Sequence, residues 1–501
     1  MPLGSGDAMI NSIPTRYLTP LFDIAAIRRR EQASFAAEGN SFAMMQRAGA
    51  ALYQHILRRF PKLTHLDVVI GGGNNGGDGF IVAALAAQDG LVVSIFDVSE
   101  TPRSGDAARA EQAALNYDQV ALLKGVDELS TVSRTVIVDA VTGIGFKPPL
   151  SAKYKQAVDT MNHCRHEGAW IVSVDTPSGL NACSGIGSPV VHADLVVSFI
   201  ADKIGHYLLD GSVACHDIVI ETLQAVDAPD QALAYFVDPS ALEKYLPCSR
   251  LPNSHKGTYG HVAVIGGDAG FGGAAIMASE ASAKSGAGTV SLFTHERHLS
   301  ASLVRNPNVM CLCDKDGALT QALRGQQPVV VIGPGLGKSA WSSEAWNQFS
   351  NQDVSAVIDA DGLYWLMKKP IKRSRMVLTP HPGEAARLMG WTVSEVLSDL
   401  VSAAKRIAER YLSVVILKGA TSVVASPSGQ VMIVGQPCPG LAKGGSGDIL
   451  SGIVGSCLAY YTDPFEAAVI AAAWHNKAGK ACEKQVGAIA MQPYQLLDYL
   501  E

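Results

Sequence analysis

The sequence lacks long apolar runs and clusters of basic residues. No stretch approaches the ~20 apolar residues that a membrane-spanning helix needs, and the chain opens without the pattern of a signal peptide. We therefore expect no membrane partner and place the protein in the cytoplasm. The formal charge is −6 at pH 7, and the sequence has no run of basic residues. Nucleic acid is therefore not an expected partner.

The sequence also lacks paired cysteines and has few aromatic residues. Nine cysteines occur, but none forms the CxxC pair that is typical of zinc sites and redox motifs. The nearest approach, Cys311-Leu312-Cys313, fits a buried strand better than a metal site. Aromatic residues make up only 7% of the chain whereas glycine occurs 49 times. This balance is typical of an α/β protein with many tight turns.

Length and apolar pattern predict two domains. A chain of 501 residues is too long for one hydrophobic core. In both halves, short apolar runs typical of buried strands alternate with segments that have the periodicity of helices. This alternation predicts an α/β fold with two doubly wound domains. This alternation breaks in a proline-rich stretch over 225–252. We predict a disordered tail over 1–18, a first domain over 19–232 and a second over 233–501.

In the first half, polar loops follow three predicted strands. The run Gly71–Phe80 reads G-G-G-N-N-G-G-D-G-F, and the helix behind it is expected to begin at Ile81. Asp139 and Asp175 each follow a later strand. Because ligands bind outside the carboxyl ends of strands in open α/β sheets, the oxygens of these loops would suit a hard cation. The alternative, that each Asn or Asp only forms a turn, stays open.

In the second half, the stretch Gly440–Gly452 reads G-L-A-K-G-G-S-G-D-I-L-S-G. Such glycines let backbone N–H groups approach an anion, and a helix that begins there adds its positive end. Asp448 would be repelled by that anion unless it removes a proton near a transferring phosphoryl group. A tight turn capped by an aspartate is the alternative.

Several motifs resemble known families. Gly445–Asp448 (G-S-G-D) and Thr379–Glu384 (T-P-H-P-G-E) are similar to motifs of the ribokinase-like superfamily. With K-G-T-Y-G-H, G-P-G-L-G and K-G-A-T, the second half resembles ADP-dependent NAD(P)H-hydrate dehydratases. Through M-Q-R-A-G, G-G-N-N-G-G-D-G, D-A-V-T-G-I-G-F-K and D-T-P-S-G, the first half resembles NAD(P)H-hydrate epimerases. Together they resemble the bifunctional nicotinamide-nucleotide repair enzymes of bacteria.

The resemblance implies a Rossmann-like first domain, a ribokinase-like second domain and a homo-oligomer. The first domain would interconvert the R and S hydrates of NADH and NADPH (NADHX and NADPHX). The second would dehydrate the S hydrate with ADP and release AMP and phosphate. Asp448 would deprotonate the C6 hydroxyl of the hydrate, which attacks the β-phosphoryl group of ADP. Mg²⁺ would accompany the nucleotide near Glu384.

For the epimerase, Asp175 is the candidate acid/base, with Lys147 assisting the departing oxygen. Further roles are implied by the resemblance for larger sets. The first domain would bind K⁺ through Asn75, Asp139 and Ser178, and the hydrate through Asn74, Asn75, Gly76, Gly77, Asp78, Gly143, Ile144, Gly145, Phe146, Lys147, Pro148, Pro149 and Asp175. The second would bind the hydrate through Ala274, Gly337, His381 and Asp448, and the AMP part of the nucleotide through Lys418, Gly419, Ala420, Thr421, Ser422 and Gly447.

Two other classes of function stay open at this point. A small-molecule kinase of the same superfamily would use Asp448 and its anion-binding turn for plain phosphorylation, although the first half argues against it. A binding protein whose first half has lost catalysis is the other, and it is disfavoured by the presence of Asp175, Lys147, Asp139 and Asn75.

Overall fold

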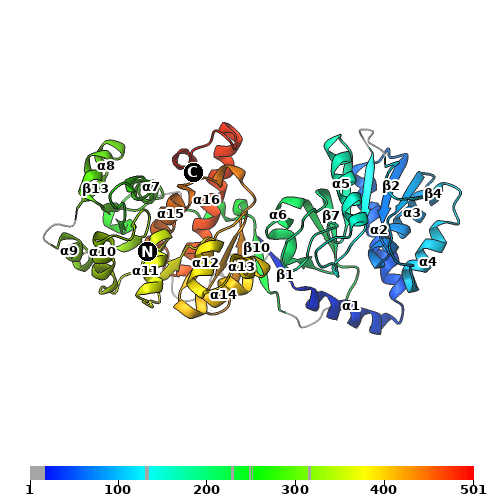
Figure 1. The fold of residues 1–501 in the computed structure, drawn as a ribbon, viewed down its shortest axis with the longest axis horizontal. Coiled ribbons are helices and arrows are strands. Elements are labelled where there is room, and N and C mark those ends of the chain that lie inside the picture. Colours follow the sequence, from blue (N-terminus) through cyan, green and yellow to red (C-terminus); the bar gives the residue numbers. More distant parts are fainter. Residues whose placement is uncertain are drawn as a thin grey trace. The chain divides into compact units, whose positions relative to one another are not determined.

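The computed structural model describes residues 17–500 except 130–134, 227–230, 248–249, 251, 314–316 and 326. Residues 1–16 of the predicted tail lie outside the described residues. Leu18, which the prediction placed in that tail, begins a strand instead. The chain divides into two compact units, one of which is Pro20–Leu233 while the other contains Ala234–Glu501 (Figure 1).

The N-terminal unit alternates strands and helices. Its described strands are β1 (Leu18–Phe22), β2 (His65–Ile70), β3 (Val92–Asp97), β4 (Val120–Lys124), β5 (Val136–Ala140), β6 (Trp170–Val174), β7 (Ala193–Phe199), β8 (Asp202–Lys203) and β9 (Cys215–Glu221). Its described helices are α1 (Ile24–Glu38), α2 (Ser41–Arg59), α3 (Asn74–Gln88), α4 (Gly105–Ala114), α5 (Ala152–His166) and α6 (Gly211–Ala214).

Seven of these strands form one sheet in the order β4-β3-β2-β5-β6-β7-β9, and every neighbouring pair is parallel. The strands are apolar on both sides because helices cover both faces. Val68 and Ile70 pack with α2 and α3 on one face, whereas Val69 packs with α5 on the other. The chain runs outward from β2 to β4 and then returns to β5, so the strand order reverses between β2 and β5. Ligands bind at such a switch point.

Helix α3 begins at Asn74, not at Ile81 as the sequence predicted. The reason is packing: a Cβ on Gly76 would lie 2.3 Å from the Gly71 carbonyl oxygen, and one on Gly77 would lie 2.7 Å from Cε of Met45. Glycine is a poor helix former, but here only glycine lets the first turns pack so closely. Asp139 also differs from its prediction, because it lies inside β5 and not in the loop after it.

The C-terminal unit repeats this plan. Its described strands are β10 (Ala234–Val237), β11 (His261–Ile265), β12 (Thr289–Phe293), β13 (Val309–Leu312), β14 (Val329–Ile332), β15 (Ala356–Ile358), β16 (Met376–Leu378), β17 (Val414–Leu417), β18 (Ser422–Ala425) and β19 (Val431–Val434). Its described helices are α7 (Gly272–Lys284), α8 (Leu299–Arg305), α9 (Ala318–Gly325), α10 (Ala340–Ser350), α11 (Ala360–Lys368), α12 (Pro382–Met389), α13 (Val393–Ser398), α14 (Leu400–Tyr411), α15 (Ser446–Tyr460) and α16 (Pro464–Val486).

These strands follow the order β13-β12-β11-β14-β15-β16-β17-β18-β19-β10. They are parallel from β13 to β17, and β18 is antiparallel to both of its neighbours. The order reverses between β11 and β14, which defines a second switch point. Helix α15 packs closely on α7, since a Cβ on Gly452 would lie 2.2 Å from the Ala278 carbonyl oxygen. In the part of the chain that the structure describes, no helix combines the length and apolarity needed to cross a membrane.

Candidate active sites

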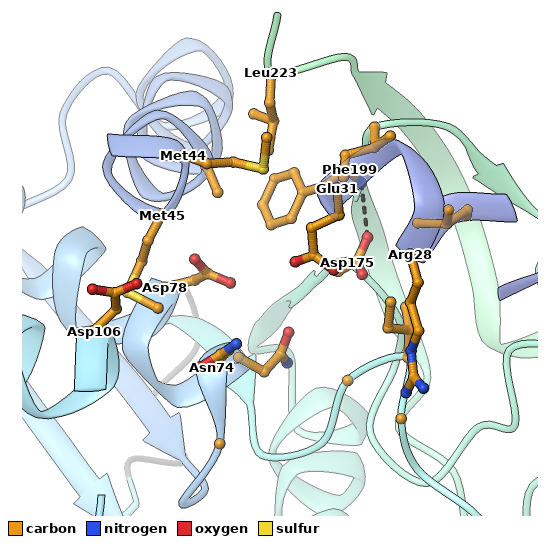
Figure 2. Close-up of a pocket in the computed structure, with 18 of the residues that line it drawn as sticks. Arg28, Glu31, Met44, Met45, Asn74, Asp78, Asp106, Asp175, Phe199 and Leu223 are labelled. Atoms are coloured by element: carbon orange, nitrogen blue, oxygen red, sulfur yellow. Dashed lines mark hydrogen bonds between the residues drawn. The ribbon is translucent and has the colours of Figure 1, made fainter. Parts of the chain in front are cut away.

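A cavity of about 680 Å³ lies at the switch point of the N-terminal sheet. Helices α1, α2 and α3 and the loop after β5 supply most of its lining (Figure 2). Of the residues predicted to bind the hydrate, the following line it: Asn74, Asn75, Asp78, Gly143, Ile144, Gly145, Phe146 and Asp175. The others are not among its lining residues. Gly76 and Gly77 are buried against neighbouring backbone and side chains, whereas Lys147, Pro148 and Pro149 are exposed.

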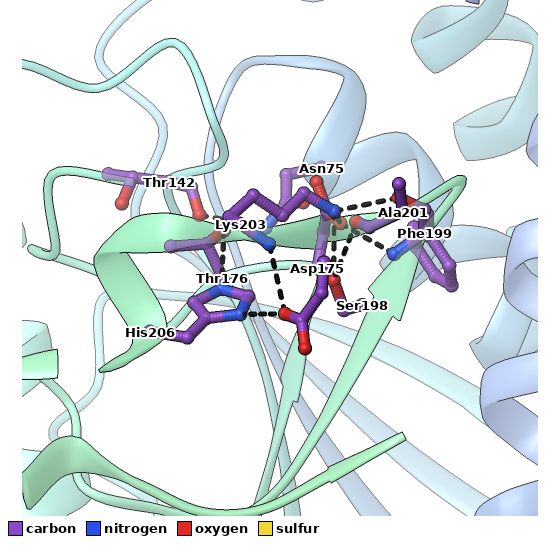
Figure 3. A network of polar contacts seen from close by, with 10 residues as sticks. Asn75, Thr142, Asp175, Thr176, Ser198, Phe199, Ala201, Lys203 and His206 are labelled. Atoms are coloured by element: carbon purple, nitrogen blue, oxygen red, sulfur yellow. Dashed lines mark hydrogen bonds and ion pairs between the residues drawn. The ribbon is translucent and has the colours of Figure 1, made fainter. Parts of the chain in front are cut away.

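Asp175 lies directly after β6 and is held in place by Lys203. Its backbone has φ 62°, a left-handed conformation that non-glycine residues rarely adopt and that is common at functional sites. The carboxylate accepts the N–H of Phe199 at 2.8 Å and forms an ion pair with the Lys203 ammonium group. Lys203 is fully buried and also donates to Oγ of Ser198 and to the Phe199 carbonyl oxygen (Figure 3). The cation beside Asp175 is therefore Lys203.

Sequence reasoning gave Lys203 no role. Its position after the apolar strand β7 could have indicated one, because Lys203 then lies at the same edge of the sheet as Asp175. Lys203 is 28 positions from Asp175 in sequence, and only the parallel pairing of β6 with β7 brings the two together.

The charges in this cavity are unevenly distributed. Among the described residues that line it, Arg28 is the only basic one, whereas Glu31, Asp78, Asp106 and Asp175 are acidic. Burial raises the pKa of both Glu31 and Asp78, and the charge of Asp175 raises them further. A Cβ on Gly145 would lie 3.3 Å from Nη2 of Arg28, so this guanidinium lies against the loop after β5 (Figure 2), and its charge partly offsets the rise in the pKa of Glu31.

The three predicted K⁺ ligands are connected by hydrogen bonds, Asn75 to Ser178 through the Thr142 backbone and Ser178 to Asp139 directly. Oδ2 of Asp139 accepts from Oγ of Ser173 at 2.7 Å and from the Ser178 N–H at 2.8 Å. Asn75 donates to the Thr142 carbonyl oxygen, and Ser178 Oγ accepts the Thr142 N–H. Asp139 is fully buried, and burial raises its pKa. Every donor to Asp139 in the described structure is neutral, which would suit a bound cation because a buried carboxylate is costly without one.

The second site surrounds the start of α15. Gly445, the residue before the helix, has φ 106° and would bring a Cβ within 2.8 Å of Cε of Met277, so only glycine fits. No side chain of the described residues caps this helix end. The N–H of Ser446 donates to the Lys443 carbonyl oxygen, whereas those of Gly447 and Asp448 have no partner among the described hydrogen bonds and are available to an anion, which the positive end of the helix also attracts.

Asp448 lies in this first turn within a group of charged residues. The Lys418 ammonium group is 2.8 Å from Oδ1 of Asp359 and 3.9 Å from Oε2 of Glu384, and the Ser451 hydroxyl donates to Asp359. Burial raises the pKa of Asp448 to about 7, and the charges of Asp359 and Glu384 add to this effect while Lys418 opposes it. A carboxyl with a pKa near neutrality suits a general base.

Asp359 is the residue that sequence reasoning missed at this site. Asp359 directly follows β15 and precedes α11, but no motif indicated its contact with Lys418. The remaining predicted residues lie at nearby loops. The N–H of Gly337 donates to Asp361 at 2.9 Å, and Nδ1 of His381 accepts the N–H of Gly383 at the start of α12.

Ala274 lies in the first turn of α7, beside the loop after β14, since a Cβ on Gly335 would lie 3.3 Å from the Cβ of Ala274. Ala274 therefore lies near the C-terminal switch point, and its contact with the hydrate stays a prediction. Thr421 is buried, while Gly419 and Ala420 are exposed just before β18.

The pKa of Asp448 predicts a pH dependence for a reaction in which it is the base. Because protonation removes the basic form, kcat/KM should fall about tenfold per pH unit below about pH 7 and level off above it. The measurement is dehydration of pure S hydrate at saturating nucleotide between about pH 5 and 8. A flat profile across that range would contradict this role.

Comparisons with known proteins agree with this division of the chain. A family model described as NAD(P)H-hydrate dehydratase matches residues 262–501, and one described as YjeF-related protein N-terminus matches residues 41–205. The bifunctional NAD(P)H-hydrate repair enzyme Nnr of Coxiella burnetii is 34% identical over 497 residues, which covers 96% of this chain and 99% of the relative. The protein of the same name from Escherichia coli is 35% identical over 494 residues, covering 95% and 92%.

Among solved structures, a ribokinase-like superfamily protein of Enterococcus faecalis superposes with a TM-score of 0.50 at 24% identity. The match covers 55% of this chain and 96% of that one. The fold is thus α/β with two sheets, one of them ribokinase-like. The chain belongs to the family of bifunctional NAD(P)H-hydrate repair enzymes, and the family predicted from the motifs is confirmed.

Proposed function

We propose that the C-terminal unit converts the S hydrate of NADH or NADPH back to the reduced nucleotide at the expense of ADP, and that the N-terminal unit interconverts the R and S hydrates. The observation that carries the first activity is the position of Asp448, beside Lys418 and within the uncapped first turn of α15. The observation that carries the second is the ion pair of Asp175 and Lys203 at the N-terminal cavity.

In the dehydratase reaction, Asp448 removes the proton of the C6 hydroxyl, and the oxygen attacks the β-phosphoryl group of ADP while AMP leaves. Phosphate then departs from C6 with the electrons of the C–O bond, and loss of a proton from C5 restores the C5–C6 double bond. The first-turn N–H groups of α15 and Lys418 stabilise the charge on the transferred group. The AMP part is held by Lys418–Ser422 and Gly447, and the hydrate by Ala274, Gly337 and His381.

The described residues include no cluster of three or more His, Cys, Asp or Glu side chains that could hold a metal ion. Mg²⁺ would therefore be held chiefly by the phosphates of the nucleotide, with Glu384 as the nearby carboxylate, and would neutralise phosphate charge. In the N-terminal unit, the oxygens of Asn75, Asp139 and Ser178 would hold K⁺, because the donors to the buried Asp139 carboxylate among the described residues are all neutral.

The N-terminal cavity would orient the hydrate by charge. Asp78 on one side and Glu31 and Asp175 on the other would repel a diphosphate (Figure 2), so the diphosphate of the hydrate would lie against Arg28, the loop Gly143–Phe146 and the first turn of α3. Apolar side chains that include Phe35, Met44 and Phe199 also line the cavity and would contact the nicotinamide ring. A homo-oligomer and a cytoplasmic location stay predictions.

The test of both activities is incubation of the purified protein with ADP, Mg²⁺ and a mixture of R and S hydrates. We expect complete conversion to reduced nicotinamide absorbance with one AMP for each hydrate consumed. A stable phosphorylated alcohol with no gain in that absorbance would instead indicate a small-molecule kinase.

Replacing Arg28 by Ala tests the orientation of the hydrate. A charge-assisted hydrogen bond contributes roughly 1.5–3 kcal/mol, so the KM for epimerisation should rise about 10- to 100-fold with little change in kcat. Arg29→Ala is the matched control, since Arg29 is the next residue of α1 but is not among those that line the cavity. An unchanged KM in Arg28→Ala would place the diphosphate elsewhere.

A further inference from the structure

Two carboxyl groups lie on different sides of the N-terminal cavity. Asp78 projects from α3, whereas Asp175 follows β6, and Figure 2 shows the space of the cavity between them, with Glu31 on the same side as Asp175. The three carboxyl groups interact through their charges, because the charge of Asp175 raises the pKa of both Asp78 and Glu31. Only Asp175 among these three has been given a chemical role so far.

The stereochemistry of epimerisation requires proton transfer on two faces, which rests on the function proposed above. In the R and S hydrates the C6 hydroxyl projects from opposite faces of the nicotinamide ring. Epimerisation by loss and return of this oxygen must break the C–O bond on one face and form it on the other. A carboxyl group on one wall of the cavity reaches one face only.

We propose that Asp78 is a second catalytic acid/base of the epimerase site and serves the face of C6 opposite to that served by Asp175. In one direction, Asp78 donates its proton to the C6 hydroxyl, and the C–O bond breaks with its electron pair to release water. The lone pair of the ring nitrogen forms the C=N bond of the resulting cation. Water adds to C6 from the other face, and its proton passes to Asp175. The reverse direction exchanges these roles, and bulk water restores the starting protonation.

The surroundings of the two groups support this assignment. Asp175 is paired with the buried Lys203 ammonium group, which favours the carboxylate. Asp78 has no cationic partner among the described residues, and burial raises its pKa well above its usual range, with Asp175 and Glu31 adding to the shift. The charged groups that share the cavity with Asp78 are Glu31 and Arg28 of α1, Asp106 of α4 and Asp175. Two carboxyls in contrasting environments are the arrangement that separates an acid from a base.

The experiment follows oxygen exchange at C6 in each variant. Pure R or pure S hydrate is incubated without ADP in ¹⁸O-labelled water, and label and epimer are measured by chromatography and mass spectrometry. The parent should epimerise and label both forms. Asp78→Asn should slow epimerisation ~10²-fold or more while still labelling one epimer without inversion. Asp175→Asn should label only the other epimer.

Asp89→Asn is the matched control. Asp89 follows the last residue of the same helix and does not line the cavity, and its substitution removes the same charge. The proposal is overturned if Asp78→Asn epimerises as fast as the parent, or if it loses labelling of both epimers alike, as a residue that only binds the hydrate would. If Asp78→Asn does not fold, Asp175→Asn decides, because a site with one acid would then label neither epimer. A parent protein that does not interconvert the hydrates contradicts the proposed function itself.

Discussion

Asp448→Asn is expected to abolish ADP-dependent dehydration while R and S hydrates still equilibrate. The amide is nearly isosteric with the carboxyl but cannot accept the proton of the C6 hydroxyl, and the loss of a general base typically costs ~10² or more in rate. Asp359, Lys418 and Glu384 remain in place, so nucleotide binding should change little. The measurement is the rate of formation of reduced nicotinamide from pure S hydrate, with AMP release as a second readout.

The other activity of the same protein is the control for this variant. Because Asp175 and its cavity lie in the other unit of the chain, epimerisation measured without ADP should match the parent. Dehydration above about a tenth of the parental rate would show that Asp448 is not the base. Loss of both activities together would indicate a folding defect.

Asp175→Asn should cause the complementary failure. A mixture of R and S hydrates with ADP and Mg²⁺ should yield reduced nucleotide until the S form is consumed and then stall, apart from slow spontaneous epimerisation. The physical reason is that the amide cannot shuttle the proton on its face of C6. If the variant consumes the R fraction as fast as the parent, Asp175 is not an acid/base of the epimerase.

This substitution also changes stability, which the sequence did not suggest. Lys203 is fully buried and loses its ion pair in Asp175→Asn, and breaking a buried pair from one side costs about 3–5 kcal/mol. We therefore expect a lower Tm for the N-terminal unit. The double variant Asp175→Asn/Lys203→Met should recover much of that stability without recovering epimerisation, which separates the role in folding from the role in the reaction.

The apolar pattern of the sequence was sufficient to predict most strands. In β11 (His261–Ile265), for example, four consecutive residues are apolar and buried, because strands of a parallel sheet are buried on both faces. The motif at Gly445–Asp448 was sufficient to predict a helix start with an acid in its first turn, since glycine there meets a local need for close backbone approach. Both predictions depend on neighbours in sequence.

The start of α3 could not be predicted in this way. The glycines of Gly71–Gly79 favour a loop by intrinsic propensity, and only their close contacts with Met45 and Ala140 show why a helix forms there. Those contacts belong to other elements, α2 and β5, so no local pattern records them.

The sequence by itself determined the fold class and the family and singled out Asp448 and Asp175 as candidate acids, because each depends on short-range order along the chain. Only the tertiary structure paired Asp175 with Lys203, paired Asp359 with Lys418, 59 positions apart, and set Arg28 and Asp78 on one cavity. The physical reason is that parallel strands bring distant loops to one edge of a sheet, while the ion pairs that form there depend on where each side chain lies in space, and the linear order of residues does not encode that position directly.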